Sequence, residues 1–246
     1  TGQSLPIVVT GGLPPYDISV IDTVTLGNIS GAYPNLVFTP NNNAVGTETI
    51  TLQATDQIGN IAPAELTLTV CRDSITYHVA DGDVQGLRNS INDAQDAICG
   101  FVPDVIELAQ NGEYLFGDYV DPVPGPSALP LINTNLTING NGASLIRDEL
   151  ASAFRLLTIA AALDTTIEIN NLQIINGYAG PGAYRDAWGG GAYVLGSDAD
   201  YSRFVTFDGV LFQENNADSR GHALYAGGRN ITIKNGAFLN NGNNEA

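Results

Sequence analysis

Two short stretches of the sequence carry the side chains best suited to chemistry: "YRDAW" (184–188) and "SDADYSR" (197–203). They bring together the carboxylates of Asp186, Asp198 and Asp200, the guanidinium groups of Arg185 and Arg203, and the aromatic rings of Tyr184, Trp188 and Tyr201. Aromatic rings stack on sugars, and carboxylate oxygens are calcium ligands. If both stretches are loops on one face, they predict a glycan-binding patch with calcium as its one conceivable cofactor. The alternative is two solvated loops, since their spacing matches no specific catalytic or metal motif.

Other chemistry-bearing residues have a structural alternative that we favour. His222 lies near Arg220 and Asp218 and has the side chain of an acid or base, but we favour a structural position for it, at a corner or on a sheet face. His78 lies in an expected strand. Asp56 and Asn60, in "TDQIGN", are further calcium candidates that a type I turn also explains. The sequence has no nucleophile elbow, CxxC or HExxH motif, and its glycine clusters do not begin a helix, so we predict no catalytic residue.

Charge excludes several classes of partner. Acidic residues outnumber basic ones by 26 to 9, the formal net charge is −17, and Lys234 is the one lysine. Binding to nucleic acid or to anionic membranes needs clustered Lys and Arg, so neither partner is expected. No apolar run is long enough to span a membrane. These features predict a protein that lies outside the cell or on its surface.

The methionine and cysteine content is typical of an exported protein. The chain has no methionine, which predicts a processed or excised piece of a longer product. Its two cysteines, Cys71 and Cys99, are expected to form a disulfide, which would stabilise an exported protein by roughly 3–4 kcal/mol on the chain-entropy model. The alternative is two buried free thiols.

The elements that must position these residues fall into two regions, 1–71 and 72–246. In the first, five β-branched segments separated by Gly, Pro and Asn turns predict a small antiparallel sandwich. These segments are "LPIVVT" (5–10), "YDISVI" (16–21), "NLVFTP" (35–40), "ETITLQAT" (48–55) and "AELTLTV" (64–70). Alternation is clearest where Ile50, Leu52 and Ala54 are expected to face the core and Thr49, Thr51 and Gln53 to face outward.

In the second region, strand–Asn/Gly–strand patterns repeat loosely: "IEINNLQIING" (167–177), "VTFDGVLFQENN" (205–216) and "ITIKNGAFLNNG" (231–242). Such a repeat is typical of a solenoid, with parallel strands about 4.8 Å apart and Asn or Gly at corners that need positive φ. Alignment of the repeats predicts two core columns. One contains Ile174, Phe212 and Phe238, and the other contains Ile169, Phe207 and Ile233.

One helix is expected, near 84–98, because Leu87, Ile91, Ala94 and Ile98 form a single apolar stripe. Asp83 is placed to cap its first turn. An amphipathic helix is a usual cover for the hydrophobic end of a solenoid, so we assign it that role.

The first region resembles the immunoglobulin-like modules repeated in bacterial surface proteins. The resemblance is carried by "GGLPPYDISV", "FTPNNNAVGTETITLQATDQIGN" and "AELTLTV" and covers nearly all of residues 2–70. Such modules usually begin with a further strand, so the sandwich is expected to lack its first strand.

The second region resembles the right-handed parallel β-helices of the pectin-lyase-like superfamily, in particular its adhesin-type and surface-anchored members. "GLRNSINDAQ" is similar to their opening segment, with Ser90 at a position usually occupied by alanine, and "DVIELAQNGEYLF" to the next. The resemblance therefore implies an all-β chain: an Ig-like β-sandwich followed by a capped β-helix. This superfold hosts lyases, hydrolases, phage spikes and adhesins, so it implies no single activity.

Two functions remain in view. We favour a non-catalytic extracellular structural or adhesive protein. The alternative is a protein that binds acidic polysaccharides, or cleaves them as a lyase, through the 184–203 patch.

Both ends of the chain are expected to be open, because the sandwich lacks an edge strand and the solenoid a C-terminal cap. Either a neighbouring domain or a second subunit would cover them, and head-to-tail contacts of the second kind would build a filament or surface layer. Surface glycans are the other expected partners.

Overall fold

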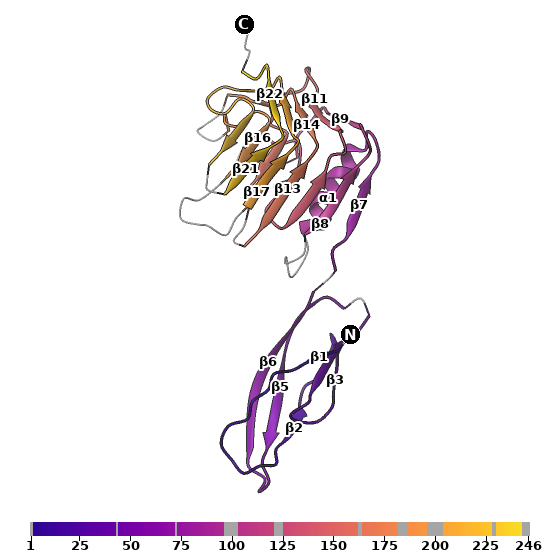
Figure 1. Cartoon of the computed structure of the whole chain (residues 1–246), viewed down its shortest axis with the longest axis vertical. Helices are drawn as coiled ribbons and strands as arrows, with labels where there is room; N and C mark the ends of the chain where they lie inside the picture. The colour runs from indigo at the N-terminus through magenta and orange to yellow at the C-terminus, as the bar shows by residue number, and fades with distance from the viewer. Residues whose placement is uncertain are drawn as a thin grey trace. The chain divides into compact units, whose positions relative to one another are not determined.

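The computed structural model describes residues 2–42, 44–71, 73–95, 103–120, 125–161, 164–181, 186–195, 204–227 and 230–242. The chain divides into two compact units, Thr1–Asp73 with Ala97–Cys99, and Ser74–Asp96 with Gly100–Ala246 (Figure 1). The sequence placed the division after Cys71, whereas the contacts place it after Asp73. Strands dominate both units, and one α-helix occurs within the described ranges.

The first unit consists of two small antiparallel sheets. One sheet has the order β1–β4–β3 and the other β2–β5–β6. The strands are β1 (Gln3–Ser4), β2 (Asp17–Val20), β3 (Gly27–Ser30), β4 (Val37–Pro40), β5 (Gly46–Thr55) and β6 (Ile61–Val70). Ile50 and Leu52 are buried in a core with Phe38 and Leu68, which confirms the predicted alternation as far as Leu52, whereas Gln53 and Ala54 are both half-buried.

The strand predicted over 5–10 is wrong. Pairing at this edge ends early: β1 covers Gln3–Ser4, and the amide of Leu5 still donates to the carbonyl of Leu36 (2.9 Å). Pro6 follows and has no N–H to extend the ladder. The side chain of Val8, inside the expected strand, is 81% exposed. The sequence also missed β3, whose Gly27 and Asn28 are poor strand formers.

The second unit is built from parallel sheets. Their orders are β21–β17–β13–β10–β8–β7, β22–β18–β14–β11–β9, β12–β16–β20 and β15–β19. The first sheet contains β7 (Thr76–Val79), β8 (Asp104–Leu108), β10 (Leu136–Asn139), β13 (Thr166–Asn170), β17 (Phe204–Asp208) and β21 (Ile231–Lys234). The second contains β9 (Glu113–Phe116), β11 (Ser144–Arg147), β14 (Gln173–Ile175), β18 (Leu211–Gln213) and β22 (Ala237–Leu239). The smaller sheets contain β12 (Leu157–Ile159), β16 (Ala192–Val194) and β20 (Leu224–Ala226), and β15 (Tyr178–Ala179) and β19 (Asn216–Ala217).

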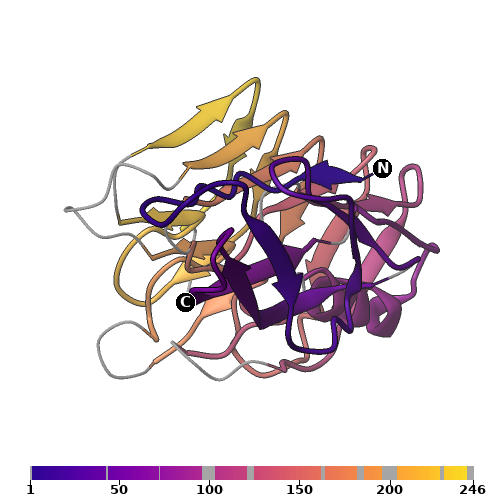
Figure 2. The same ribbon diagram turned by 90° about the horizontal axis from the view of Figure 1, so that it is seen from below.

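The chain visits these sheets in turn, so that each turn of the chain lays its strands on those of the turn before. From β13 to β16 it passes once through all four sheets, and from β17 to β20 it repeats the same order. Figure 2 shows the strands of this unit following one another in sequence order, from magenta through orange to yellow.

Both predicted core columns are confirmed by the strand register. Ile174 pairs with Phe212, which pairs with Phe238, and the two phenylalanine rings stack with their centroids 5.1 Å apart. Ile169 pairs with Phe207, which pairs with Ile233. Both columns continue through earlier turns of the chain, so the apolar core is continuous along the stack.

The corners use asparagine as the sequence predicts. Asn111, Asn141, Asn171, Asn176 and Asn235 all have positive φ, between 46° and 60°. This left-handed region is tolerated by Asn better than by most residues with a Cβ.

The helix α1 (Val84–Gln95) buries Leu87, Ile91 and Ala94 against the core of the second unit. The carboxylate of Asp83 accepts the N–H of Gly86 (2.8 Å), so the predicted N-cap is confirmed. Arg88 is buried on the same helix, and its guanidinium donates to the Asp118 carboxylate (2.7 Å) and to the Ala128 carbonyl (3.0 Å). Ile98, the last residue of the expected stripe, lies outside the described residues.

A polar ladder runs across the outward face of the six-stranded sheet. Glu107, Asn139, Asn170, Asp208 and Lys234 occupy one register position on successive strands. Asn139 donates to Glu107 (2.6 Å), Asn170 donates to Asn139 (3.1 Å), and Lys234 pairs with Asp208 (3.1 Å). Hydrogen bonds from Asn139 and Asn141 lower the pKa of Glu107, and those from Asn235 and Lys234 lower the pKa of Asp208.

This ladder predicts an acid-sensitive second unit. Because the folded-state pKa of Glu107 is depressed, its stabilisation is present above the unfolded value of about 4.3 and is lost as the pH falls through the folded value. The stability difference between the wild type and Glu107→Gln should therefore shrink as urea unfolding is repeated from about pH 7 down to about pH 3. Glu113→Gln, at an exposed position on β9, should follow the wild-type curve. A difference for Glu107→Gln that stays constant with pH would contradict this account.

Candidate functional site

The structure describes two of the eight residues in the patch predicted from the sequence, Asp186 and Trp188. Tyr184, Arg185, Asp198, Asp200, Tyr201 and Arg203 lie outside the described residues. Their glycan and calcium roles therefore stay predictions. The described neighbourhood of Asp186 and Trp188 is, however, well defined.

Five planar groups form a continuous stack around Trp188, and we call this set the aromatic–arginine stack. Its order is Arg220, Trp188, Tyr225, Tyr193 and Arg155. The guanidinium carbon of Arg220 lies 5.0 Å from the centroid of the Trp188 ring, and the Trp188 and Tyr225 centroids are 4.6 Å apart. The rings of Tyr225 and Tyr193 stack at 5.4 Å with an interplanar angle of 16°, and the guanidinium carbon of Arg155 lies 4.8 Å from the Tyr193 centroid. Each contact falls within the range of aromatic stacking or cation–π attraction.

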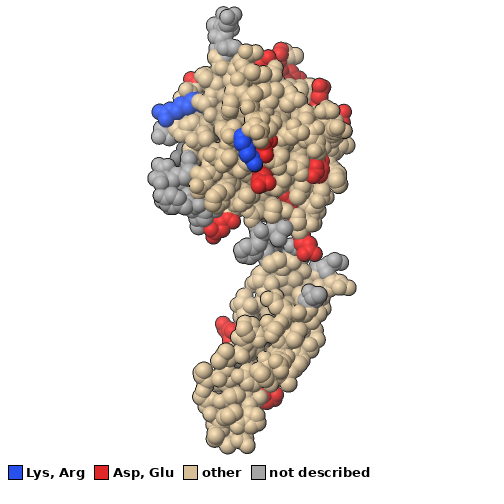
Figure 3. Space-filling view, in the orientation of Figure 1, with Lys and Arg blue, Asp and Glu red and all other residues tan. Residues whose placement is uncertain are grey.

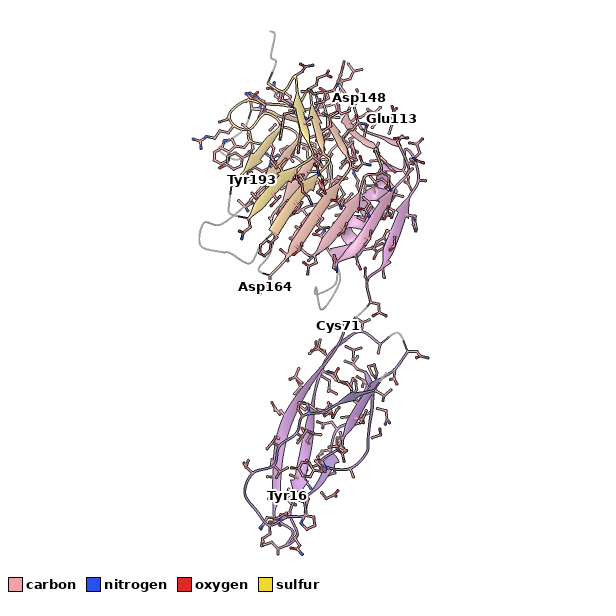
Figure 4. All side chains as sticks on the ribbon, viewed as in Figure 1. Tyr16, Cys71, Glu113, Asp148, Asp164 and Tyr193 are labelled. Carbon is pink, nitrogen blue, oxygen red and sulfur yellow. The ribbon has the colours of Figure 1, made fainter. Side chains whose placement is uncertain are left out.

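Strand register places the two tyrosines. Tyr193 on β16 pairs directly with Tyr225 on β20. Ala192 and Val194, on either side of Tyr193, belong to the apolar core, so alternation along the strand directs the tyrosine to the outward face. Figure 4 labels Tyr193 on the left side of the second unit. Although it faces outward, its side chain is only 1% exposed.

Close backbone packing places Trp188. An isolated parallel bridge joins it to Arg220, and Gly189–Gly191 follow it directly. A Cβ on Gly190 would collide with the carbonyl oxygens of Asn216 and His222. The glycine run therefore allows successive turns of the chain to approach closely beneath the stack.

Arg155 closes the inner end of the stack. Its side chain is fully buried, and its Nη2 donates to the backbone carbonyl of Asp186 (2.8 Å). Burial lowers the pKa of Arg155 to about 10, because the cation loses solvation. It therefore remains a cation at neutral pH, and the Tyr193 face is one of the groups that stabilise it.

The outer end of the stack is exposed and polar. Arg220 is exposed, and the indole N–H of Trp188 donates to the hydroxyl of Ser219 (3.3 Å). Nearby, the hydroxyl of Tyr178 donates to Asp218 (2.7 Å), and this bond raises the pKa of Tyr178. Arg220 and Tyr225 both contact the Trp188 ring, so a sugar that stacks on Trp188 must first displace Arg220.

The remaining candidates have structural partners. His222 Nδ1 lies 2.8 Å from Asn216 Oδ1, and His78 occupies an exposed register position beside Glu107. Asp56 accepts the N–H groups of Leu13, Ile58 and Asn60 at 3.2, 3.0 and 2.8 Å. These contacts support the turn interpretation of Asp56.

Metal and disulfide expectations stay open. Within the parts of the chain that the structure describes, no group of three or more His, Cys, Asp or Glu residues could hold a metal ion. Cys71 is a described residue and Cys99 is not, so the bridge between them stays a prediction. No helix in the described ranges is long and apolar enough to cross a membrane.

The sequence singled out neither tyrosine of the stack, although it contained a signal for both. "GGAYVLG" and "HALYAGG" are counterparts in consecutive turns, and Tyr193 and Tyr225 occupy the same position in them. Arg155 had no such signal, because a single arginine before an apolar strand reads as an ordinary surface residue.

Comparison with family models, with curated proteins and with solved structures gave no significant match for this chain.

Proposed function

We propose that the chain is a non-catalytic extracellular structural and adhesive protein. In this proposal the first unit is an Ig-like sandwich, and the second is a right-handed parallel β-helix of the pectin-lyase-like type, covered at its start by α1. The observation that carries the proposal is the coil-to-coil register of the second unit. It stacks both apolar columns and the polar ladder in line over successive turns of the chain. Repeats that contact only their neighbours build a long, regular scaffold.

The polar side chains of the second unit bond to one another, which supports a structural and non-catalytic role. Glu107 accepts two asparagine amides, Asp208 accepts Asn235 and pairs with Lys234, and His222 is engaged by Asn216. A carboxylate whose pKa is lowered by such bonds is a poor general acid at neutral pH. These groups serve the stack of coils.

The exposed end of the aromatic–arginine stack is the adhesive contact in this proposal. Contact with Trp188 orients the guanidinium of Arg220, and a pre-oriented guanidinium binds carboxylates through paired hydrogen bonds. An acidic glycan, with a carboxylate on each sugar, is the ligand class that fits this contact and the composition of the patch predicted from the sequence.

Binding and cleavage can be measured in one experiment. The purified chain is incubated with polygalacturonate and with alginate, with and without calcium, while retention on the immobilised glycan and the ultraviolet absorbance of unsaturated products are followed. We expect retention without product. Arg220→Ala should weaken binding at least about tenfold, since a hydrogen bond to a charged group contributes roughly 1.5–3 kcal/mol and 1.4 kcal/mol is a factor of ten.

Lys234→Ala is the matched control, because it removes one exposed positive charge from another face of the unit. It should leave binding within about twofold of the wild type. Unsaturated products would contradict the non-catalytic proposal and support the lyase alternative. Equal losses for the two variants would contradict a specific contact at Arg220.

A further inference from the structure

The outward face of the sheet β22–β18–β14–β11–β9 carries an apolar column that the core does not use. Leu115, Ile146 and Ile175 are direct register partners on three neighbouring strands. Their neighbours Tyr114, Leu145 and Ile174 are buried, so alternation directs the column outward. Leu115 is 56% exposed.

The column forms the floor of a surface hollow of about 540 Å³. Leu150, whose side chain is 96% exposed, also lines it. An exposed leucine beside three aligned apolar residues is unusual on a protein surface, and such patches mark interaction sites.

Acidic side chains flank this floor on both sides. Asp148, Glu149 and Glu214 line the hollow beyond the ends of β11 and β18. On the other side, Glu113 lies two residues before Leu115 on the same face of β9, and both it and Asp148 are labelled in Figure 4. On the face of the molecule drawn in Figure 3, acidic side chains also outnumber basic ones.

Among the described residues that line the hollow, Arg147 is the single basic one, and its guanidinium is held by backbone carbonyls of its own chain. Its side chain is buried, and it donates to the backbone carbonyls of Asn176 (2.8 Å), Asp148 (3.0 Å) and Ala151 (2.9 Å). Its guanidinium is therefore committed to the corner and does not reach out to an anionic partner. An apolar floor with acidic flanks selects a partner that is apolar along its centre and cationic at its sides.

The spacing of the three apolar side chains in the column fits a helix of the partner better than an extended strand. Neighbouring strands are about 4.8 Å apart, so the three side chains span about 10 Å. Residues i, i+4 and i+7 of an α-helix rise by about 10.5 Å on one face, whereas same-face residues of an extended strand repeat every 6.6 Å or so. A second copy that presents this same face is disfavoured, because its Asp148, Glu149 and Glu214 would meet like charges.

We propose that this face, defined by Leu115, Ile146, Leu150 and Ile175 with their acidic flanks, is a docking surface for a cationic amphipathic helix of a partner protein. The apolar stripe of that helix lies along the column, and its Lys and Arg residues meet Asp148, Glu149 and Glu214 on one side and Glu113 on the other. This is the helix-in-groove mode of recognition.

The test uses three synthetic peptides of about 14 residues, or four helical turns, each labelled for fluorescence polarisation. The first has a leucine stripe flanked by lysines. The second has the same stripe flanked by glutamates. The third has the composition of the first but carries central prolines that prevent a helix. We expect the whole chain to bind the first peptide at least about tenfold more tightly than either of the others.

Variants locate the binding surface. Ile146→Asp places a charge in the centre of the column and should weaken binding of the first peptide about tenfold or more. Val105→Asp, on the outward face of the other large sheet, is the matched control and should bind like the wild type. Because Ile146→Asp also perturbs a strand, the exposed double variant Glu149→Lys with Glu214→Lys is measured as well. It should reverse the preference between the first and second peptides.

With the peptides and variants, any of four results would overturn the proposal: equal affinity for the lysine and glutamate peptides, tight binding of the proline peptide, unchanged binding by both Ile146→Asp and the Glu149→Lys, Glu214→Lys double variant, or a dimer that Ile146→Asp dissociates. The last would assign the face to a second copy of the chain. Binding to anionic vesicles in place of the peptide would assign it to a lipid surface and would equally overturn the proposal.

Discussion

Replacing Phe212 by alanine is expected to destabilise the second unit by about 3–5 kcal/mol, the usual cost of removing a buried phenylalanine ring. Phe212 is fully buried and lies in the core column between Ile174 and Phe238. Its ring stacks on that of Phe238 and meets the edge of Phe207 at a centroid distance of 5.7 Å. Strands on both sides hold the backbone in register, so the cavity left by the ring cannot collapse easily.

Phe238→Ala is the matched control, since it removes the same side chain from the same column. Its ring is 49% exposed, so we expect a loss of about half that of Phe212→Ala or less. Urea unfolding followed by the fluorescence of Trp188 measures both, because this is the single tryptophan of the chain and reports on the second unit alone. If Phe212→Ala and Phe238→Ala lost the same free energy of unfolding, the finding that Phe212 is more deeply buried than Phe238 would be contradicted.

The second large effect is expected for Asn215→Ala, which should destabilise the same unit by about 2–4 kcal/mol. The side chain of Asn215 is fully buried. Its Oδ1 accepts the N–H of Gly177 (2.8 Å), and its Nδ2 donates to the carbonyl of Ile174 (2.8 Å) and to Asn241 Oδ1 (3.0 Å). Alanine leaves the Gly177 N–H and the Ile174 carbonyl without this partner in a place that water does not reach, and each such buried group costs about 1–3 kcal/mol.

An exposed asparagine provides the comparison. Asn133→Ala removes an exposed side chain while keeping the backbone N–H that donates to Gln95, and it should change stability by about 0.5 kcal/mol or less. The same urea titration with Trp188 fluorescence serves both variants. If Asn215→Ala unfolded at the same urea concentration as Asn133→Ala, the buried amide would not be a structural link between successive turns of the chain.

Much of the second unit could be predicted from the sequence because its fold repeats. The pairings of Ile174 with Phe212 and of Phe207 with Ile233 followed from aligning the strand–Asn/Gly–strand patterns. The register of stacked parallel strands is fixed by the inward–outward alternation of side chains and by the Asn and Gly residues at the corners. A shift of register by one residue would turn the apolar side chains of a strand to the outside. Similarly, Asp83 and the stripe from Leu87 to Ala94 indicated α1 through capping and periodicity.

The first unit was less predictable because its edges are set by single residues. The segment 5–10 has the β-branched composition of a strand, yet Pro6 interrupts the ladder after Leu5. β3 forms from a sequence with low strand propensity because it pairs with β4 along four residues. Tertiary pairing overrides the low local propensity at β3, whereas a single proline ends the pairing at 5–10.

The aromatic–arginine stack could be predicted only in part, for a different physical reason. Tyr193 and Tyr225 share a position in two repeats, so their contact follows from register. Trp188 and Arg220 lie outside the regular strands and meet through an isolated bridge, and Arg155 is buried as a cation. Composition and periodicity carry no information on such contacts, because these contacts depend on the path that the non-repetitive segments between the strands take.

The most direct test of the central claim is a fluorescence titration of Trp188 with an oligogalacturonate, repeated with a neutral oligosaccharide of the same length. Because Trp188 lies between Arg220 and Tyr225, a carboxylate that engages Arg220 must alter the surroundings of the indole. The account predicts a saturable change with the acidic sugar, its loss in Arg220→Ala, and no cleavage of the sugar after the titration. An unchanged spectrum at saturating glycan, or a sugar recovered in shorter pieces, would contradict the proposal of a non-catalytic adhesive protein.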